Sequence, residues 1–150
     1  MSLQMATCKR RLAALWFGGA ATLFLLLIVQ STLGRYADRT SDAWSWFLPT
    51  IMPTLSLIIG VLVIDAVGRS VAANADRFLF RLTLGISTCY LLAVLLVIVM
   101  QPFSELEPID LMNQSNLWLG PLQGLVAAAL GAFFVKAPES SSSADPQKQD

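Results

Sequence analysis

The sequence predicts an all-α membrane protein, a bundle of four transmembrane helices. Of the 150 residues, 55% are hydrophobic and only 13% are charged, whereas an ordinary soluble domain has about 25% charged residues. Four apolar segments of about 19 to 23 residues are long enough to cross a hydrocarbon core about 30 Å thick. Hydrocarbon offers the backbone no hydrogen bonds, and the segments lack the alternating pattern of a membrane barrel, so each is predicted to be a helix. The spans are residues 12–30, 46–67, 78–100 and 117–135.

The four spans form one transmembrane domain, residues 12–136, between two polar ends. Residues 1–11 are a basic N-terminus that ends in Lys9, Arg10 and Arg11. Residues 137–150 contain two prolines and four consecutive serines. A segment of this composition has too little apolar surface to fold on its own, so it is predicted to be a disordered tail.

A cleaved signal peptide is the alternative interpretation of the first span, because a basic stretch precedes it and Ser31 follows it as a small exit residue. The apolar run exceeds the usual signal core of about 7 to 15 residues, and no A-x-A sequence follows it. Retention of this segment gives four spans. Cleavage would leave three spans with the same orientation.

Basic residues are distributed unevenly among the connections. Eight of the ten Lys and Arg residues fall on one side: Lys9, Arg10, Arg11, Arg69, Arg77, Arg81, Lys136 and Lys148. The other side has Arg35 and Arg39, offset by Asp38 and Asp42, and a third connection that is acidic. By the positive-inside rule both termini are predicted to be cytoplasmic. The predicted location is a bacterial inner (cytoplasmic) membrane or a plasma membrane.

Aromatic rings at the ends of the spans are expected to lie in the two headgroup layers, because their rings are apolar and their edges are polar. Tyr36, Trp46 and Trp118 fall at the outer boundary of the predicted spans. Trp16 and Phe78 fall toward the inner boundary. The aromatic residues and the basic residues therefore place the water interfaces at the same positions.

The second span carries prolines and hydroxyl residues in its outer third. Pro49 and Pro53 each remove a backbone donor and push against a preceding carbonyl, so the helix is predicted to bend. The hydroxyls of Thr50 and Thr54 can bond carbonyls left without partners. Such a helix is either a packing kink or the lining of an ion path. Gln123, in the fourth span, is expected to face a partner helix or the water of that path.

Asp65 is the only acidic residue inside an apolar segment, and it lies near the inner end of the second span. Ionisable residues within membrane helices are candidates for ion or proton movement. Arg69 stands four residues further on, along the same helix face, and Arg81 lies in the third span. An interfacial ion pair of Asp65 with one of these arginines explains the carboxylate without proton coupling. A role in ion movement is the alternative.

Two connections give local predictions. The connection between the second and third spans is short, so these helices are predicted to be antiparallel neighbours, with Asp76 as the cap of the third. The third connection, residues 101–116, is predicted to contain a short interfacial turn through Leu106, Ile109 and Met112. Its three carboxylates are expected to be solvated rather than to bind a divalent cation.

The fourth span carries the most specific packing pattern of the chain. Gly120, Gly124, Ala128 and Ala132 recur at intervals of four, and Gly131 widens this stripe. Lipid tails give helices no hydrophobic incentive to associate, so close van der Waals contact along a groove of small residues holds membrane helices together. The face is predicted to pack either inside the bundle or against a partner.

The residue types that carry most catalytic and metal chemistry are missing. The chain has no histidine, which is a frequent general base and metal ligand. Cys8 and Cys89 form no C-x-x-C pair. The sequence also has no glycine-rich phosphate loop and no basic nucleic-acid surface. We therefore expect no enzyme activity, no metal, no cofactor and no nucleic-acid partner.

These observations lead to two functional hypotheses. The first is a non-enzymatic accessory or scaffolding subunit of a membrane complex, which acts by helix association with a second copy or with another membrane protein. The alternative is a homo-oligomeric pore, channel or small transporter lined by the kinked second helix. Several copies would be needed for the alternative, because four short helices leave little room for an aqueous path.

Overall fold

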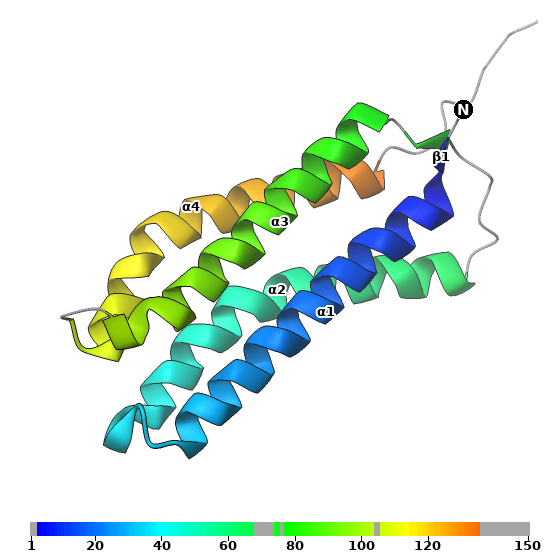
Figure 1. The fold of residues 1–150 in the computed structure, drawn as a ribbon. Helices are drawn as coiled ribbons and strands as arrows, with labels where there is room; N and C mark the ends of the chain where they lie inside the picture. Colours follow the sequence, from blue (N-terminus) through cyan, green and yellow to red (C-terminus); the bar gives the residue numbers. More distant parts are fainter. Residues whose placement is uncertain (1–2, 68–73, 76, 104–105, 136–150) are drawn as a thin grey trace, which may run out of the picture.

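The structure is a computed structural model that describes residues 3–67, 74–75, 77–103 and 106–135. The described residues form four α-helices, two short 3-10 helices and one pair of two-residue strands (Figure 1). In chain order these are β1 (Leu3–Gln4), α1 (Met5–Thr32), η1 (Ala37–Arg39), α2 (Thr40–Val67), β2 (Asn74–Ala75), α3 (Arg77–Met100), η2 (Gln101–Phe103) and α4 (Pro108–Val135).

All four helices of the described part are long and apolar enough to cross a membrane. The prediction of an all-helical chain with four membrane-spanning segments is confirmed to that extent, and the architecture is that of an integral, multi-pass membrane protein. The predicted tail, the predicted cap Asp76 and residue Arg69 lie outside the described residues.

Three helices begin well before the predicted spans. Helix α1 begins at Met5 and includes the basic residues before the apolar run, and α2 begins at Thr40. Helix α4 begins at Pro108, so Ile109 and Met112 of the predicted interfacial turn are instead part of the helix, and Leu106 precedes it. Proline at the first helical position has no N–H to leave unpaired. Ile109 and Met112 then lie one turn apart and are both buried against the bundle. At 1.5 Å per residue α4 is about 42 Å long, which exceeds the hydrocarbon thickness.

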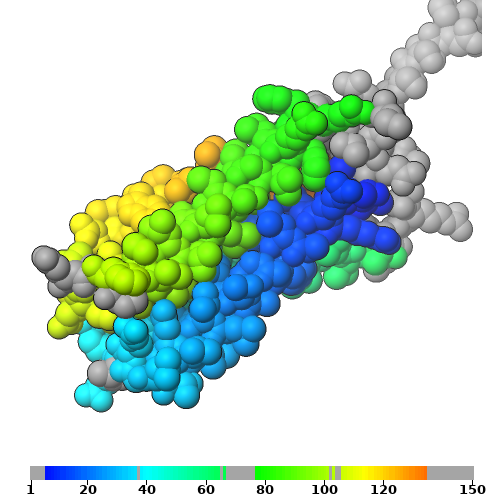
Figure 2. All heavy atoms as spheres, in the orientation of Figure 1, coloured from blue at the N-terminus to red at the C-terminus, as the bar shows by residue number. Residues whose placement is uncertain are grey.

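The helices surround the core in the order α1, α2, α4, α3, so that each packs along two others. Within the described residues α2 and α3 lie diagonally opposite, and the prediction that they are neighbours is wrong. The connection between Val67 and Arg77 is long enough to cross the end of the bundle at about 3.3 Å per extended residue. Figure 2 shows the face where the side chains of α1 and α3 meet along the bundle.

A close contact between α1 and α3 accounts for that pairing. A Cβ added to Gly19 would lie 2.8 Å from a methyl carbon of Leu91, a distance that neither group could keep. Glycine at this position therefore lets the Leu91 side chain of α3 lie against the backbone of α1, and a larger residue would require the leucine methyl groups to shift. The neighbouring Gly18 has open space at the corresponding position in the described structure.

Several aromatic residues expected at the membrane surfaces are buried between helices. Trp16 is fully buried, and its ring centroid lies 5.9 Å from that of Tyr90. Tyr36 and Trp46 are also buried, whereas Trp118 and Phe78 are exposed as expected. The apolar rings that face inward add van der Waals contact between helices. This contact matters because lipid tails give helices no hydrophobic incentive to associate.

The two ends of the bundle differ. The N-terminal strand, the start of α3 and the end of α4 lie at one end, and the α1–α2 and α3–α4 connections lie at the other (Figure 1). At this second end Arg39 donates to the carboxylates of Asp42, at 3.1 Å, and Glu107, at 3.3 Å. The hydrogen bond to Asp42 raises the pKa of Arg39, and the charges of Asp110 and Glu107 raise it further.

Replacing Met112 tests the extended start of α4. Met112→Ala is expected to lower the free energy of unfolding by about 2 to 5 kcal/mol, because it leaves a cavity under a fully buried side chain. Leu117→Ala is the control, since Leu117 is 78% exposed and its loss should change stability by no more than about 0.5 kcal/mol. Unfolding in mixed micelles, followed by circular dichroism, measures both. Equal effects would contradict the packing of this end of α4.

Candidate functional site

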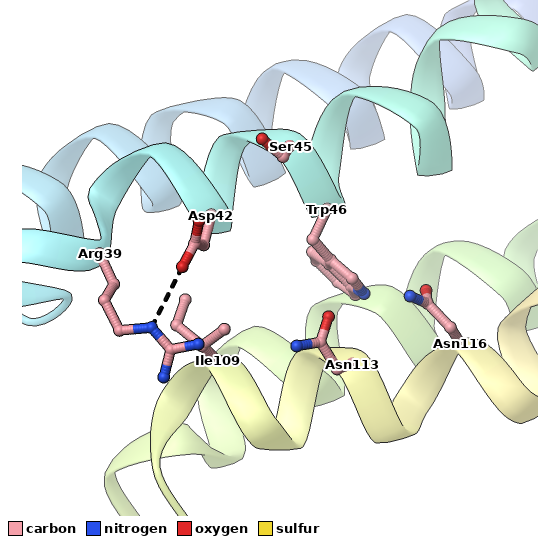
Figure 3. A pocket seen from close by; sticks show the side chains of 7 residues that line it. All are labelled: Arg39, Asp42, Ser45, Trp46, Ile109, Asn113 and Asn116. Atoms are coloured by element: carbon pink, nitrogen blue, oxygen red, sulfur yellow. Dashed lines mark hydrogen bonds and ion pairs between the residues drawn. The ribbon is translucent and has the colours of Figure 1, made fainter.

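A polar groove runs between α2 and α4, and it consists of two adjoining hollows that share Ser45, Trp46 and Asn116. The outer hollow has a volume of about 270 Å³ and opens at the end of the bundle that carries Arg39 (Figure 3). Its lining residues are Arg39, Asp42, Ser45, Trp46, Ile109, Asn113 and Asn116. The inner hollow has a volume of about 300 Å³ and reaches Pro49, Thr50, Tyr90 and Gln123.

The inner hollow ends at backbone carbonyls of α2. Pro53 has no N–H, so the carbonyl of Pro49, four residues earlier, lacks its helical partner. Gln123 of α4 replaces that partner, since its Nε2 lies 3.2 Å from the Pro49 oxygen and 3.3 Å from the Thr50 oxygen. The structure therefore joins the proline segment of α2 to α4 through one amide side chain.

Tyr90 of α3 completes this arrangement from the other side. Its hydroxyl donates to the Thr50 carbonyl at 2.8 Å, and its ring contacts Trp16 of α1. All four helices thus meet at one level of the bundle. The sequence reasoning missed Tyr90, although a tyrosine in the middle of an apolar span needs a hydrogen-bond partner inside the bundle.

The predicted residues of the kink have different roles in the structure. The hydroxyl of Thr50 donates to the carbonyl of Trp46 at 2.7 Å, which is not one of the carbonyls that the prolines leave free. Thr54 is buried in the same region, and Pro53 is exposed. The amide of Gln123 supplies the bond that we expected from the threonines. Figure 1 shows the axis of α2 turning part-way along the helix.

Trp46 is the least satisfied side chain of the groove. It is only 5% exposed, and its indole nitrogen has no hydrogen-bond partner among the described residues. Figure 3 shows the ring extending from α2 toward α4, with the nitrogen on the side of Asn116. An unpaired buried donor costs about 1 to 3 kcal/mol. The sequence placed this indole in the headgroup layer, where water or lipid would bond it.

The small residues of α4 lie on its outward side. Gly120, Gly124, Ala128 and Ala132 are exposed, and Gly131 is half-buried. A Cβ added to any of these three glycines would meet no atom of the described residues within 4 Å. The bundle itself therefore does not use this face for close helix packing. Gly120 also lines the inner hollow, so the face and the groove are contiguous.

The predicted ion pair of Asp65 is not among the described contacts. Asp65 lies in the last turns of α2, but its side chain and the whole of Arg69 lie outside what the structure describes. Arg81 is in the first turns of α3 and is exposed. This pair stays a prediction.

The polar side chains that line the groove can donate and accept hydrogen bonds. In the described parts of the chain no three His, Cys, Asp or Glu side chains gather in a way that could hold a metal ion. Cys8 is buried and Cys89 is exposed, and neither forms a disulfide. No protein-family model, curated protein or solved structure matches this chain.

A double-mutant cycle tests the link between Gln123 and the proline segment. Gln123→Leu is expected to destabilise the bundle by about 0.6 kcal/mol, the average for hydrogen bonds between membrane helices, and by no more than about 1.7 kcal/mol. In a Pro53→Ala background residue 53 regains an N–H that can bond the Pro49 carbonyl, so the same replacement should cost less. Unfolding in mixed micelles gives all four stabilities.

Gln114→Leu provides the matched control, because Gln114 is an exposed glutamine of α4 outside the groove. Its replacement should cost the same with and without Pro53→Ala. An equal cost of Gln123→Leu in both backgrounds would show that Gln123 does not act through the Pro49 carbonyl.

Proposed function

We propose that this protein is a non-enzymatic accessory or scaffolding subunit of a membrane complex, and that α4 binds a helix of a second copy or of another membrane protein. The supporting observation is the outward position of the small-residue face, defined by Gly120, Gly124, Ala128, Gly131 and Ala132. Three of these residues are glycines with open space where a side chain would be.

The physical argument concerns how closely two helices can approach. Lipid tails are as apolar as leucine, so apolar side chains alone do not draw helices together in a bilayer. A face without bulky side chains lets a partner backbone come close, which increases van der Waals contact and favours weak hydrogen bonds from Cα–H groups to carbonyls. The stripe extends along α4 from Gly120 to Ala132, which at 1.5 Å per residue is about 18 Å.

The proposed orientation places both termini in the cytoplasm of a bacterial inner or plasma membrane. In support, Lys9, Arg10 and Arg11 lie in the first turns of α1, at the end of the bundle where α4 also finishes (Figure 1). The opposite end carries Arg39 among carboxylates. An excess of Lys and Arg marks the cytoplasmic side of a membrane protein.

The pore alternative has less support from the geometry. A path along α2 would use the carbonyls that the prolines leave free. Of these, the Pro49 carbonyl already accepts a hydrogen bond from Gln123, and the adjacent Thr50 carbonyl accepts from Gln123 and Tyr90. An ion would have to displace both side chains before it could be coordinated there.

Bulky replacements on the α4 face test the proposal. The double variant Gly124→Leu with Ala128→Leu is expected to dissociate the complex, because two isobutyl groups keep the partner backbone at a distance. Native mass spectrometry of protein purified from its own membranes in mild detergent measures the bound partner and the stoichiometry. The expected loss is at least about tenfold in the bound fraction, or roughly 1.4 kcal/mol.

Gly60→Leu is the matched control, since Gly60 is an exposed glycine of α2 that also has open space around it within the described structure. This variant should retain the partner. A strictly monomeric wild type that recovers no partner from native membranes would refute the proposal.

Ion flux separates the proposal from the pore alternative. Vesicles that contain the purified protein are expected to show no flux above protein-free vesicles across a set of monovalent and divalent ions. A current that Pro53→Ala or Asp65→Asn alters would favour the pore instead.

A further inference from the structure

We propose that the groove between α2 and α4 binds one glycerophospholipid with an ethanolamine headgroup, from the leaflet at the end of the bundle that carries Arg39. This site adjoins the small-residue face at Gly120, and it does not depend on the association proposed for that face. Three features of the groove lead to this ligand: an unpaired donor, the balance of charges at the rim and an apolar continuation below.

The unpaired donor is the indole N–H of Trp46. It is a donor only, so the missing partner must be an acceptor. Trp46 is only 5% exposed, its nitrogen has no partner among the described residues, and the residue lines both hollows. Phosphate and ester carbonyl oxygens of a phospholipid are acceptors at this depth. Asn113 and Asn116 line the same hollow and add amide donors from α4 (Figure 3).

The charges at the rim select the headgroup. Arg39 is surrounded by Asp42, Glu107 and Asp110, all of which act on it electrostatically, so these four groups carry a net negative charge. An anionic headgroup would meet repulsion there. A zwitterionic headgroup places its phosphate near Arg39 and its cation near the carboxylates. A primary ammonium is favoured over a quaternary one, because it donates hydrogen bonds to carboxylates.

The apolar continuation favours a lipid over a soluble headgroup analogue. Below the shared residues the inner hollow is lined by Pro49, Leu119 and Gly120 beside three polar residues, Thr50, Tyr90 and Gln123. The two hydroxyls and the amide nitrogen of these polar residues already donate hydrogen bonds within the bundle. The apolar positions leave space for an acyl chain next to the helix. A ligand with one polar end and one apolar end matches both parts of the groove, which a partner helix with apolar side chains does not.

Lipid binding to the purified protein tests the proposal. Delipidated protein in mild detergent is titrated separately with dioleoyl phosphatidylethanolamine, phosphatidylcholine and phosphatidylglycerol, and native mass spectrometry counts the bound lipids. We expect a single phosphatidylethanolamine that is retained about three- to tenfold more tightly than either phosphatidylcholine or phosphatidylglycerol. Glycerophosphoethanolamine, which lacks acyl chains, should not saturate the site at the same concentrations.

Matched tryptophan variants locate the bound lipid. Trp46→Phe keeps an aromatic ring and removes only the N–H, so it should weaken phosphatidylethanolamine about three- to tenfold. Trp118→Phe makes the same chemical change at an exposed tryptophan of α4 outside the groove, and it should leave the affinity unchanged. Asp110→Asn, on the exposed rim, should reduce the discrimination against phosphatidylglycerol about two- to threefold.

Four results would overturn the proposal. The first is equal retention of the three lipids in proportion to their concentration. The second is an equal loss in the two tryptophan variants. The third is saturation by glycerophosphoethanolamine alone, which would show a site for a soluble headgroup. The fourth is a protein partner that occupies the groove in place of lipid, which would show a protein interface.

Discussion

The structure depends on one constraint: inside a bilayer the chain must supply its own hydrogen bonds. Hydroxyl groups meet this constraint locally, as when Thr22 and Thr88 donate to carbonyls one turn earlier in their helices. Amide and phenol groups meet this constraint with hydrogen bonds between helices, and these bonds fix the relative positions of the helices. Gln123 and Tyr90 converge on α2 in this way, and Gln30 donates to the Ile98 carbonyl of α3 at 3.1 Å.

Such bonds give the bundle a defined register, which apolar packing alone would not. Thr83 of α3 donates to the Leu79 carbonyl of its own helix at 2.8 Å and lies 3.3 Å from the Ala129 carbonyl of α4. Five side chains of the described structure have buried polar atoms without partners: Trp16, Ser31, Trp46, Ser87 and Gln101. Of these, Trp46 adjoins a hollow large enough for a ligand, and the other four have no explanation in the structure.

The sequence predicted the spans better than it predicted their neighbours. In water the buried face of a helix is identified because its other face is polar. In lipid both faces are apolar, so the pattern does not say which helix lies beside which. The pairing of α1 with α3 includes a close contact between Gly19 and Leu91, which spacing does not reveal. Gln123 was informative because an amide inside an apolar span needs a hydrogen-bond partner within the bundle.

The proline segment of α2 also has a consequence for biogenesis. When the ribosome has delivered only the first hairpin, the Pro49 carbonyl has no donor, because Gln123 belongs to the last helix to be made. The early hairpin is thus an incomplete insertion intermediate that carries an exposed polar defect. Folding is completed only when α4 has entered the membrane, and a nascent chain halted before that point would present this defect to membrane quality control.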